Sequence, residues 1–475
     1  MNENITKAFH VPLFYLLVFS LPFIGYAPLN IYGGIQMSYI LGLMILSILV
    51  TSNLIFNGKI RFFKQLSSRI LFFWVFIAIL ASLILSLAVP EEFSKYYAGE
   101  QQPLTRSIKM IFRLFMVISV YLVSLQIMRD EKIFRKTMRF LIYGGLFSSV
   151  YGLYQAVAYK LNLPFTDLFC NNISFLGRGT PTVYPWGWAG MLRIGSTAYE
   201  PCIFADFLLV IIPMYGFVIL NNQRVLKTRL RDIIAFSFIF LAFTLTFSRA
   251  GWIALSFGFF LLIVYLVKKK NLLSASKKVF PAIIAIGFFL FLMFGVTFGR
   301  IDVKKRFLSR FNFIASALSG ELTKGQDYTF DHKVTSYGVA ANIIKKHPLF
   351  GVGLGNYGFY YESNLPRWGS DYLMTKGTRG MWANPKGIYM QILTDTGIIG
   401  FFIFSLFIIV TLKKNARLTK EADSDYMKTV AIGLRLSFFT LLIQGLSFSG
   451  LYFSHWWFLL AAMAAGSGNN TLKVS

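Results

Sequence analysis

Charged residues are scarce in this sequence. Asp, Glu, Lys and Arg make up 14% of its 475 residues, whereas apolar residues make up 56%. A typical soluble domain carries about 25% charged residues, so too few charges are present to solvate the surface of a soluble protein of this length. With only two cysteines, the chain is not a small scaffold held by disulfides, and its 51 Phe residues exclude a disordered or collagen-like chain. A polytopic membrane protein remains.

Acidic residues are the scarcer of the two charged classes. There are 20 of them against 47 Lys and Arg, which gives a formal net charge of +27, and only four His. The sequence has no glycine-rich phosphate loop and no Cys and His cluster with the spacing of metal ligands. It therefore predicts neither a cofactor nor a metal site. A large positive charge also occurs in nucleic-acid-binding proteins, so the placement of the basic residues has to decide between these classes.

Long apolar runs dominate the rest of the chain. A lipid core of about 30 Å requires roughly 20 apolar residues per helix, and only helices or closed barrels can cross it. The runs are too continuous for the alternating pattern of barrel strands. The sequence predicts an all-α polytopic membrane protein with about twelve transmembrane helices. The predicted spans are 10–29, 35–55, 70–89, 110–128, 140–159, 201–220, 233–248, 250–267, 279–299, 387–411, 430–448 and 451–467.

Basic residues gather in every second loop between these spans. Five short loops, at 59–69, 129–139, 224–231, 268–278 and 413–428, hold 23 of the 47 Lys and Arg residues, while the short loops between them are nearly bare. This is the pattern of cytoplasmic loops. It predicts that both termini face the cytoplasm and that no nucleic acid is bound. The first span is expected to remain in the mature protein, because it lacks a convincing small-residue cleavage site.

Two predicted outer segments, 160–200 and 300–386, are long. They divide the chain into a membrane domain at 1–299 with nine spans, an extracytoplasmic loop at 300–386 with short helices, and a part at 387–475 with three spans and a cytoplasmic tail. Loops of this length are usually functional or disordered. Residues 333–346 suit a short amphipathic helix, which the glycine-rich segment after it ends.

Unlike the short outer turns, the long outer segments carry many cations. These cations form a solvated surface, which long loops tolerate, or an anion site, because a pyrophosphate needs several Arg or Lys donors. Tyr357 and nearby aromatic residues suit a helix at the membrane interface or a platform for sugar rings. His332 and His347 are candidates for proton transfer or for packing. The candidate substrate-binding cations are Arg178, Arg193, Lys333, Arg379 and Lys386.

Arg249 and Glu200 are the sharpest candidates for chemistry. Arg249 lies in a tight outer turn between two apolar helices, where a charge is costly unless paired; it either serves a site or extends to the lipid headgroups. Glu200 lies between Arg193 and Pro201 at the outer start of a helix. It either caps that helix, whose dipole favours a carboxylate, or accepts a proton from a sugar hydroxyl beside the cations.

Several segments together resemble the O-antigen polymerase and ligase superfamily. Residues 345–357, KKHPLFGVGLGNY, are similar to the family's His-Pro segment with spaced glycines, and residues 388–400, IYMQILTDTGIIG, are similar to the helix start that follows it. The Thr-Phe-Ser-Arg249 turn and residues 193–201 match as well. The order of the motifs, the twelve spans and the large late outer loop agree, so the resemblance covers most of the chain.

The resemblance implies a GT-C-type membrane glycosyltransferase on the outer face of the bacterial inner membrane. Its donor is expected to be a glycan on undecaprenyl diphosphate, used without a nucleotide sugar or a metal, for O-antigen of lipopolysaccharide, capsule or exopolysaccharide. The expected partners are this lipid-linked oligosaccharide, membrane lipids and a chain-length regulator. Glu200, Arg249 and Arg193 are the expected catalytic residues.

Two positions differ from the ligases of the superfamily. Ligases usually carry His at the position of Lys386 and commonly carry Arg at that of Lys333. Lys is normally protonated and is a poorer general base than His, while the Glu200-Pro201 pair resembles polymerases. The resemblance therefore favours a polymerase that transfers the glycan to another lipid-linked repeat unit. The alternatives are a ligase that transfers it to lipid A core or protein, and a flippase or transporter, which predicts internal repeats that the sequence does not show.

Overall fold

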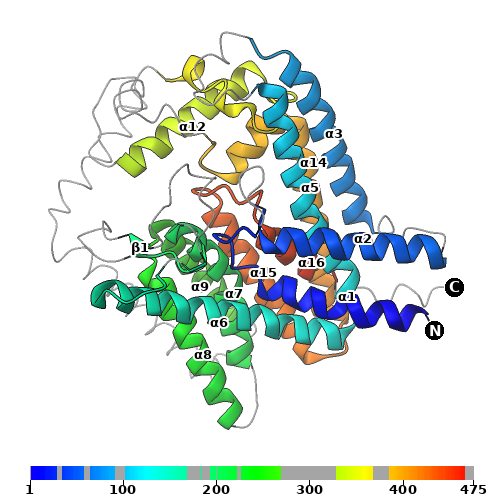
Figure 1. Ribbon diagram of the computed structural model, residues 1–475, viewed down its shortest axis with the longest axis vertical. Helices are drawn as coiled ribbons and strands as arrows, with labels where there is room; N and C mark the ends of the chain where they lie inside the picture. Colours follow the sequence, from blue (N-terminus) through cyan, green and yellow to red (C-terminus); the bar gives the residue numbers. More distant parts are fainter. Residues whose placement is uncertain are drawn as a thin grey trace.

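The computed structural model describes residues 2–28, 35–57, 65–90, 102–166, 168–169, 183–184, 193–198, 200–221, 226–268, 328–366 and 384–465 (Figure 1). The described chain is almost entirely α-helical. Its helices are α1 (Asn2–Phe19), α2 (Met37–Asn57), α3 (Leu66–Leu87), α5 (Pro103–Ile127), α6 (Glu131–Leu161), α7 (Pro201–Asn221), α8 (Leu226–Leu245), α9 (Arg249–Lys268), α12 (Tyr328–Lys346), α14 (Ile388–Glu421), α15 (Asp425–Gln444) and α16 (Ser454–Ala465). A hairpin pairs β1 (Val183–Tyr184) with β2 (Arg193–Ile194), and the 3₁₀ turns η4 (Asn356–Gly358) and η5 (Glu362–Asn364) follow α12.

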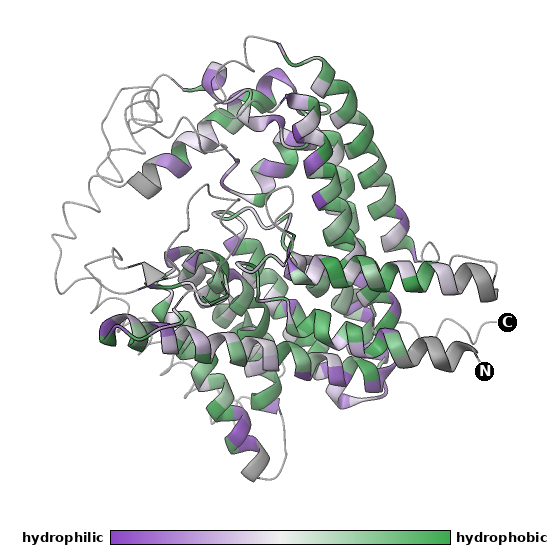
Figure 2. Ribbon diagram, in the orientation of Figure 1, coloured by the Kyte–Doolittle hydropathy of each residue, from purple (hydrophilic) through white to green (hydrophobic). Residues whose placement is uncertain are grey.

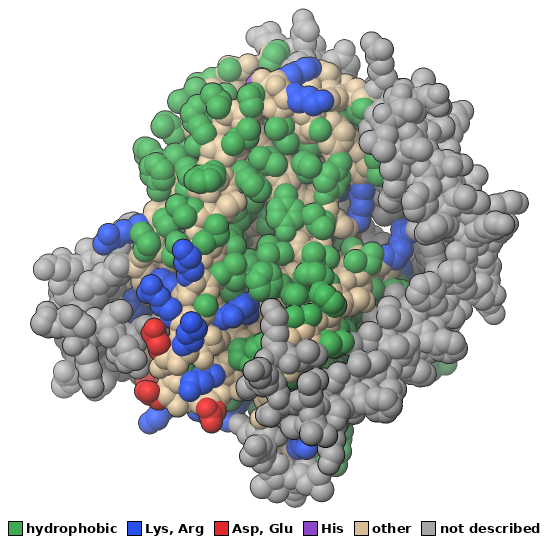
Figure 3. Space-filling model, turned by 180° about the vertical axis from the view of Figure 1, so that it is seen from behind, with side chains coloured by type: hydrophobic (Ala, Val, Ile, Leu, Met, Phe, Trp, Pro, Cys, Tyr) green, Lys and Arg blue, Asp and Glu red, His purple; other side chains and the backbone are tan. Residues whose placement is uncertain are grey.

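Six of the described helices are long and apolar enough to cross a membrane, namely α3, α5, α7, α9, α14 and α15. Figure 2 shows hydrophobic residues along most of the long helices. Figure 3 shows a broad hydrophobic surface, with Lys and Arg side chains gathered near one end of it. Helices satisfy their own backbone polar groups, as a lipid environment requires. The chain is a multi-pass membrane protein, as its composition predicts.

Eleven of the twelve predicted spans fall on described helices, and the other, 279–299, lies outside the described residues. One predicted boundary is clearly wrong. Helix α1 ends at Phe19, although the apolar run continues to residue 29. Pro22 cannot continue the hydrogen-bond ladder of the helix, and the Gly25 N–H donates to Thr197 O at 2.8 Å. The residues after α1 are thereby tied to the segment that leads into α7.

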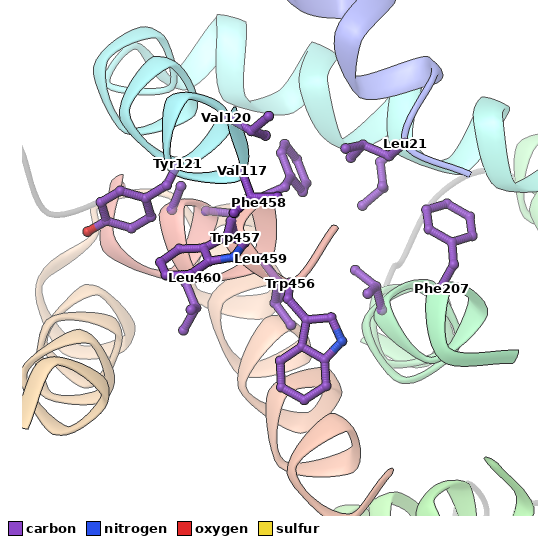
Figure 4. Close-up of a cluster of buried hydrophobic side chains, with 14 of the residues drawn as sticks. Leu21, Val117, Val120, Tyr121, Phe207, Trp456, Trp457, Phe458, Leu459 and Leu460 are labelled. Carbon is purple, nitrogen blue, oxygen red and sulfur yellow. The ribbon is translucent and has the colours of Figure 1, made fainter. Parts of the chain in front are cut away.

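Helix α16 forms the centre of the described bundle. All of its residues are buried, and it packs against α5, α7, α14 and α15. Its Trp457 ring meets the Tyr121 ring of α5 edge-on, with 6.3 Å between the ring centroids (Figure 4). Because lipid is as apolar as this core, close van der Waals packing is the main force that holds such helices together. The four alanines of α16, at 461, 462, 464 and 465, suit that close approach.

Helix α15 supplies hydrogen bonds to α7 next to a proline. Pro213 lies inside α7 and lacks the N–H that would continue the helical ladder. Ser437 of α15 donates its hydroxyl to Val210 O at 2.7 Å and accepts from the Met214 N–H at 3.2 Å. Gly433 allows this approach, since a Cβ there would lie 2.9 Å from Met214 Cα. A membrane helix tolerates an interior proline when a neighbouring helix supplies such bonds.

Helix α12 and the segment after it form a further layer. The predicted amphipathic helix at 333–346 is confirmed, and it begins five residues earlier, at Tyr328. Val339 and Ile343 pack on the aromatic residues near η4. In η4 itself, Asn356 is fully buried in a network of serine hydroxyls from α3 and α5. Buried polar groups that are satisfied in this way fix one arrangement of the backbone.

Candidate active site

Glu200 immediately precedes α7. Pro201 is the first helical residue, where its missing N–H breaks no hydrogen bond, and the Glu200 carbonyl accepts from the Ile203 and Phe204 N–H groups at 3.1 Å each. The half-buried carboxylate accepts a hydrogen bond from the Cys202 thiol, with 3.1 Å between Sγ and Oε2. Among the described residues, this thiol is the only hydrogen-bond partner of the carboxylate. Most of its acceptor capacity is therefore available to a ligand.

Arg193 connects this region to the turn that carries Arg249. Its Nε donates to Thr246 O at 2.9 Å. Arg249, which is half-buried, is the first residue of α9. A Cβ added to Gly251 would lie 3.3 Å from Ala205 Cβ. Helices α7 and α9 therefore begin side by side, and the bond to Thr246 brings Arg193 of β2 close to the turn before Arg249.

Helix α12 and the residues before α14 contribute further cations. The Lys333 Nζ donates to Ser447 Oγ at 2.6 Å, and the Ile388 N–H donates to Gly445 O at 2.9 Å. The segment between α15 and α16, residues 445–453, thus joins α12 to the start of α14. Lys386 lies two residues before that start.

Electrostatic interactions show that these segments converge. Lys386 lies within electrostatic range of Glu200 and Cys202, and Cys202 lies within range of Arg193 and Lys333. The residues come from β2, the start of α7, α12 and the start of α14, which are far apart in the sequence. We refer to them as the Glu200 cluster, which comprises Arg193, Glu200, Cys202, His332, Lys333 and Lys386.

The cluster has more positive than negative charge. Burial, together with the charges of Lys386 and Lys333, lowers the pKa of His332 to about 4, so the imidazole is neutral at pH 7. Burial also lowers the pKa of Lys386, against the opposing effects of Glu200 and Cys202. A bound anion would relieve this crowding of cations. Among the described residues, no three His, Cys, Asp or Glu side chains form a group that could hold a metal ion.

The segment between Arg193 and Glu200 is held by buried polar bonds. The Ser196 N–H donates to Gln155 Oε1 at 2.9 Å, and the Thr197 hydroxyl donates to Pro22 O at 2.7 Å. Both side chains are fully buried. Such supporting contacts fix the backbone and thereby hold Arg193 and Glu200 in a defined relative position.

The glycine-rich segment after α12 fits into a break in α14. At Gly397 the backbone has φ 66° and ψ −169°, which interrupts the helix. The carbonyls of Thr394 and Asp395 accept hydrogen bonds from the Val352 and Gly353 N–H groups, at 2.8 and 3.1 Å. Irregular backbone inside a membrane protein requires partners of this kind.

The other side of the break is satisfied in the same way. The Ile398 N–H donates to Pro348 O at 2.8 Å. A Cβ on Gly397 would collide with Leu349 O, and one on Gly351 would collide with Thr394 O. Both glycines also have positive φ, which side chains rarely adopt. The spaced glycines of the motif therefore have a structural function, which is to join this segment to α14.

Two predicted substrate-binding residues lie apart from the Glu200 cluster. His347 follows the far end of α12, about 20 Å along the helix from His332 at 1.5 Å per residue, and its ring meets that of Tyr360. Tyr357 is 1% exposed, and its hydroxyl donates to Ser336 O at 2.9 Å. Its ring thus packs α12 in place and does not offer an open platform. The predicted sites Arg178 and Arg379 lie outside the described residues.

Other residues near the cluster were not among the predicted site residues. Cys202 and Ser447 bond to Glu200 and Lys333 respectively; a thiol or a hydroxyl in an apolar run gives no signal by itself. Further along α7, the fully buried Asp206 bonds to His455 Nε2 at 2.8 Å and also accepts from an indole N–H of α16. A histidine within the last apolar run is the sequence signal that indicates this buried pair.

Residues 234–405 match the family model described as O-antigen ligase. No curated protein matches the chain. The matched part includes Arg249, Lys333, Lys386 and the glycine-rich segment, whereas Arg193 and Glu200 precede it. The match confirms the resemblance to the O-antigen polymerase and ligase superfamily over these residues, and it supports an enzymatic function of the glycosyltransferase kind.

Proposed function

We propose that this protein, which resembles the O-antigen polymerase and ligase superfamily, is a polysaccharide polymerase. It transfers a glycan from undecaprenyl diphosphate to a hydroxyl of another lipid-linked repeat unit. The observation that carries the proposal is that Glu200 lies within electrostatic range of Lys386, while Cys202, which bonds to the carboxylate, lies within range of Arg193 and Lys333. A diphosphate donor needs several cationic donors, and an acceptor hydroxyl needs a base.

In the proposed reaction the carboxylate acts as the base, and the cations stabilise the leaving diphosphate. The acceptor oxygen bonds to the anomeric carbon of the donor while the bond from that carbon to the diphosphate oxygen breaks. Glu200 takes the proton of the acceptor hydroxyl, and the departing diphosphate keeps the electron pair. Arg193 and Lys333 stabilise the charge that develops on it. Arg249, at the neighbouring helix start, is a forked donor suited to the same diphosphate.

A ligase is the second candidate, and one observation favours it. The superfamily's ligases usually carry His at the position of Lys386. His332 lies within electrostatic range of Lys386, so a neutral imidazole is available close to that position. With His332 as the base, the glycan would pass to lipid A core or to a protein. The polymerase is preferred because Glu200 has most of its acceptor capacity available and is followed by Pro201, as in polymerases that the sequence resembles.

The proposal also sets the orientation of the protein. It places the Glu200 cluster on the outer face of the bacterial inner membrane, within a GT-C-like arrangement, with both termini in the cytoplasm. The division into 1–299, 300–386 and 387–475 follows from that orientation. The proposed partners are the lipid-linked oligosaccharide and a chain-length regulator.

Deletion of the protein, followed by extraction of lipid-linked glycans, tests the proposal. A polymerase defect leaves single repeat units on their carrier at the outer face. Full-length polymer on the carrier indicates the ligase. Repeat units held on the inner face indicate a flippase, and either of the last two results overturns the polymerase.

A further inference from the structure

A groove runs between α1 and α6, away from the Glu200 cluster. Val11, Leu16 and Phe19 of α1 and Phe140 of α6 are among its lining residues, and its volume is about 680 Å³. Leu16 is 43% exposed. The groove therefore presents an apolar wall of the size of an acyl chain to its surroundings.

Next to this groove is a hollow of about 400 Å³ that is lined by cations of α6. Lys136 and Phe140 line both spaces. Lys132, Lys136 and Arg139 follow one another at intervals of four and three residues, so they project from one face of the helix, and all three are exposed. Lys136 also lies over the Tyr15 ring of α1, 4.8 Å from its centroid.

These three cations differ from the arginine between them. Arg135 forms an ion pair with Glu131 at 2.5 Å. Lys132, Lys136 and Arg139 form no ion pair with the described residues. The apolar groove is thus bordered by three positive charges without an ion-pair partner in the described part of the chain, although Asp130 lies within electrostatic range of Tyr15.

We propose that this α1–α6 basic groove binds an anionic phospholipid of the cytoplasmic leaflet. Its phosphate lies on Lys132, Lys136 and Arg139, and one acyl chain lies along Leu16 and Phe140. The charge complementarity and the continuous apolar wall favour this occupant over a soluble anion, which would use the cations alone. The cations also belong to one of the basic loops predicted to face the cytoplasm, where anionic lipids attract Lys and Arg.

The groove and the Glu200 cluster lie at opposite ends of α6. Gly152 contacts the segment that carries Arg193, since a Cβ there would lie 2.9 Å from Ile194 Cδ1. Gly152 is sixteen residues beyond Lys136, or about 24 Å at 1.5 Å per residue. The bound lipid is therefore distinct from the glycan donor, and the inference does not depend on the proposed reaction.

Native mass spectrometry of the full purified chain in detergent tests the site, with dioleoylphosphatidylglycerol and dioleoylphosphatidylcholine as probes. Two triple variants have the same charge change at the same helical spacing, and all six residues are exposed. They are Lys132→Gln/Lys136→Gln/Arg139→Gln in the groove and Lys413→Gln/Arg417→Gln/Lys420→Gln on α14. We expect the groove variant to bind phosphatidylglycerol about tenfold more weakly or worse, and the α14 variant to bind it as the wild type does. Phosphatidylcholine binds weakly to all three proteins.

A second pair of variants leaves the charge unchanged. Leu16→Trp fills the groove, whereas Leu406→Trp alters a residue of α14 with a similar exposure of 41%. Only the first is expected to weaken phosphatidylglycerol binding. Equal affinity of the two triple variants, or equal affinity for both lipids, overturns the proposal. Displacement of the lipid by millimolar inorganic phosphate also overturns it, because the ligand would then be a soluble phosphate.

Discussion

Glu200 differs from an ordinary helix cap in the partner of its carboxylate. A capping side chain accepts from backbone N–H groups of the first turn. The Glu200 carboxylate instead accepts from the Cys202 thiol, which is a weak donor. Because this bond is weak, the carboxylate can still accept a hydrogen bond from a sugar hydroxyl. It also lies within electrostatic range of Lys386.

Glu200→Gln should therefore slow turnover strongly and leave the fold intact. Glutamine keeps the shape of the side chain but cannot accept the proton, so the rate should fall about 10²- to 10⁴-fold. Purified protein with a synthetic lipid-linked repeat unit measures this. Glu362→Gln, which changes a carboxylate in η5, is the matched control and should polymerise normally. Near-normal polymer from Glu200→Gln contradicts the assignment and moves the role of base to His332.

His332 gives the stability of the protein a dependence on pH. Its pKa of about 4 in the folded protein is below the ordinary value of about 6.5, so the unfolded chain binds more protons between these values. Stability that is fully present above pH 6.5 is lost as the pH falls toward 4. Thermal unfolding in detergent at pH 7 and pH 5 should show a larger decrease in Tm for the wild type than for His332→Gln. Equal decreases would show that His332 is not the group responsible.

The sequence predicts the charged residues of the site better than it predicts the neutral ones. Lys333 and Lys386 are noticeable in the sequence because charge is rare in an apolar chain, and the structure brings both into range of the Glu200 region. Their neutral neighbours, such as Ser447, resemble any other small polar residue of a membrane helix. Tyr357 shows the opposite case, since an aromatic residue in a long loop suggests a surface but here fills a core.

At the scale of elements, the junction of α14 with the glycine-rich segment connects the two motifs on which the resemblance to the superfamily rests. Four backbone hydrogen bonds cross it, two on each side of Gly397. The junction fixes the course of α14 after its first turns, and Lys386 lies just before those turns. A motif that the sequence suggests as functional thus acts through backbone geometry.

Gly397→Ala and Gly351→Ala should each destabilise the protein severely. Alanine at either position meets a carbonyl oxygen and requires a positive φ, which together should cost about 3 kcal/mol or more. Gly216→Ala in α7 is the control, because its Cβ would lie at an ordinary 3.4 Å from Phe236 and alanine favours a helix. Tm and the yield of monodisperse protein measure the effect. A stable Gly397→Ala protein would show that the junction is not needed.

Hydropathy locates the helices better than it locates their breaks. The sequence places only two residues between the last two spans, whereas residues 445–453 are non-helical. Gly445, Ser447 and Gly450 are too few to interrupt an apolar run in a hydropathy profile, yet they allow the backbone to leave the helix and to reach Lys333 and the start of α14. Such a break depends on tertiary partners that no local pattern reveals.

At the scale of the whole molecule, charge is distributed unevenly. Lys and Arg gather in alternate predicted loops, which favours a single orientation in the membrane and predicts that the Glu200 cluster and the α1–α6 basic groove lie on opposite sides. This arrangement is required for the proposed chemistry, because the lipid-linked repeat units must meet the cluster at the outer face.

The orientation is tested by labelling single cysteines in a background without Cys170 and Cys202. Lys346→Cys, at the exposed end of α12, should react with an impermeant maleimide when the outer membrane has been permeabilised and the inner membrane is intact. Lys420→Cys, at the exposed end of α14, should react only after the inner membrane is permeabilised. The reverse pattern would place α12 and its cations in the cytoplasm and would exclude outer-face chemistry.

The most direct measurement is reconstitution of the purified wild-type protein in liposomes with one synthetic substrate, a repeat unit on undecaprenyl diphosphate. We predict a ladder of longer lipid-linked glycans, with one undecaprenyl diphosphate released for each new glycosidic bond. A repeat unit that stays single in this mixture, and is joined only to lipid A core when that acceptor is added, would contradict the polymerase.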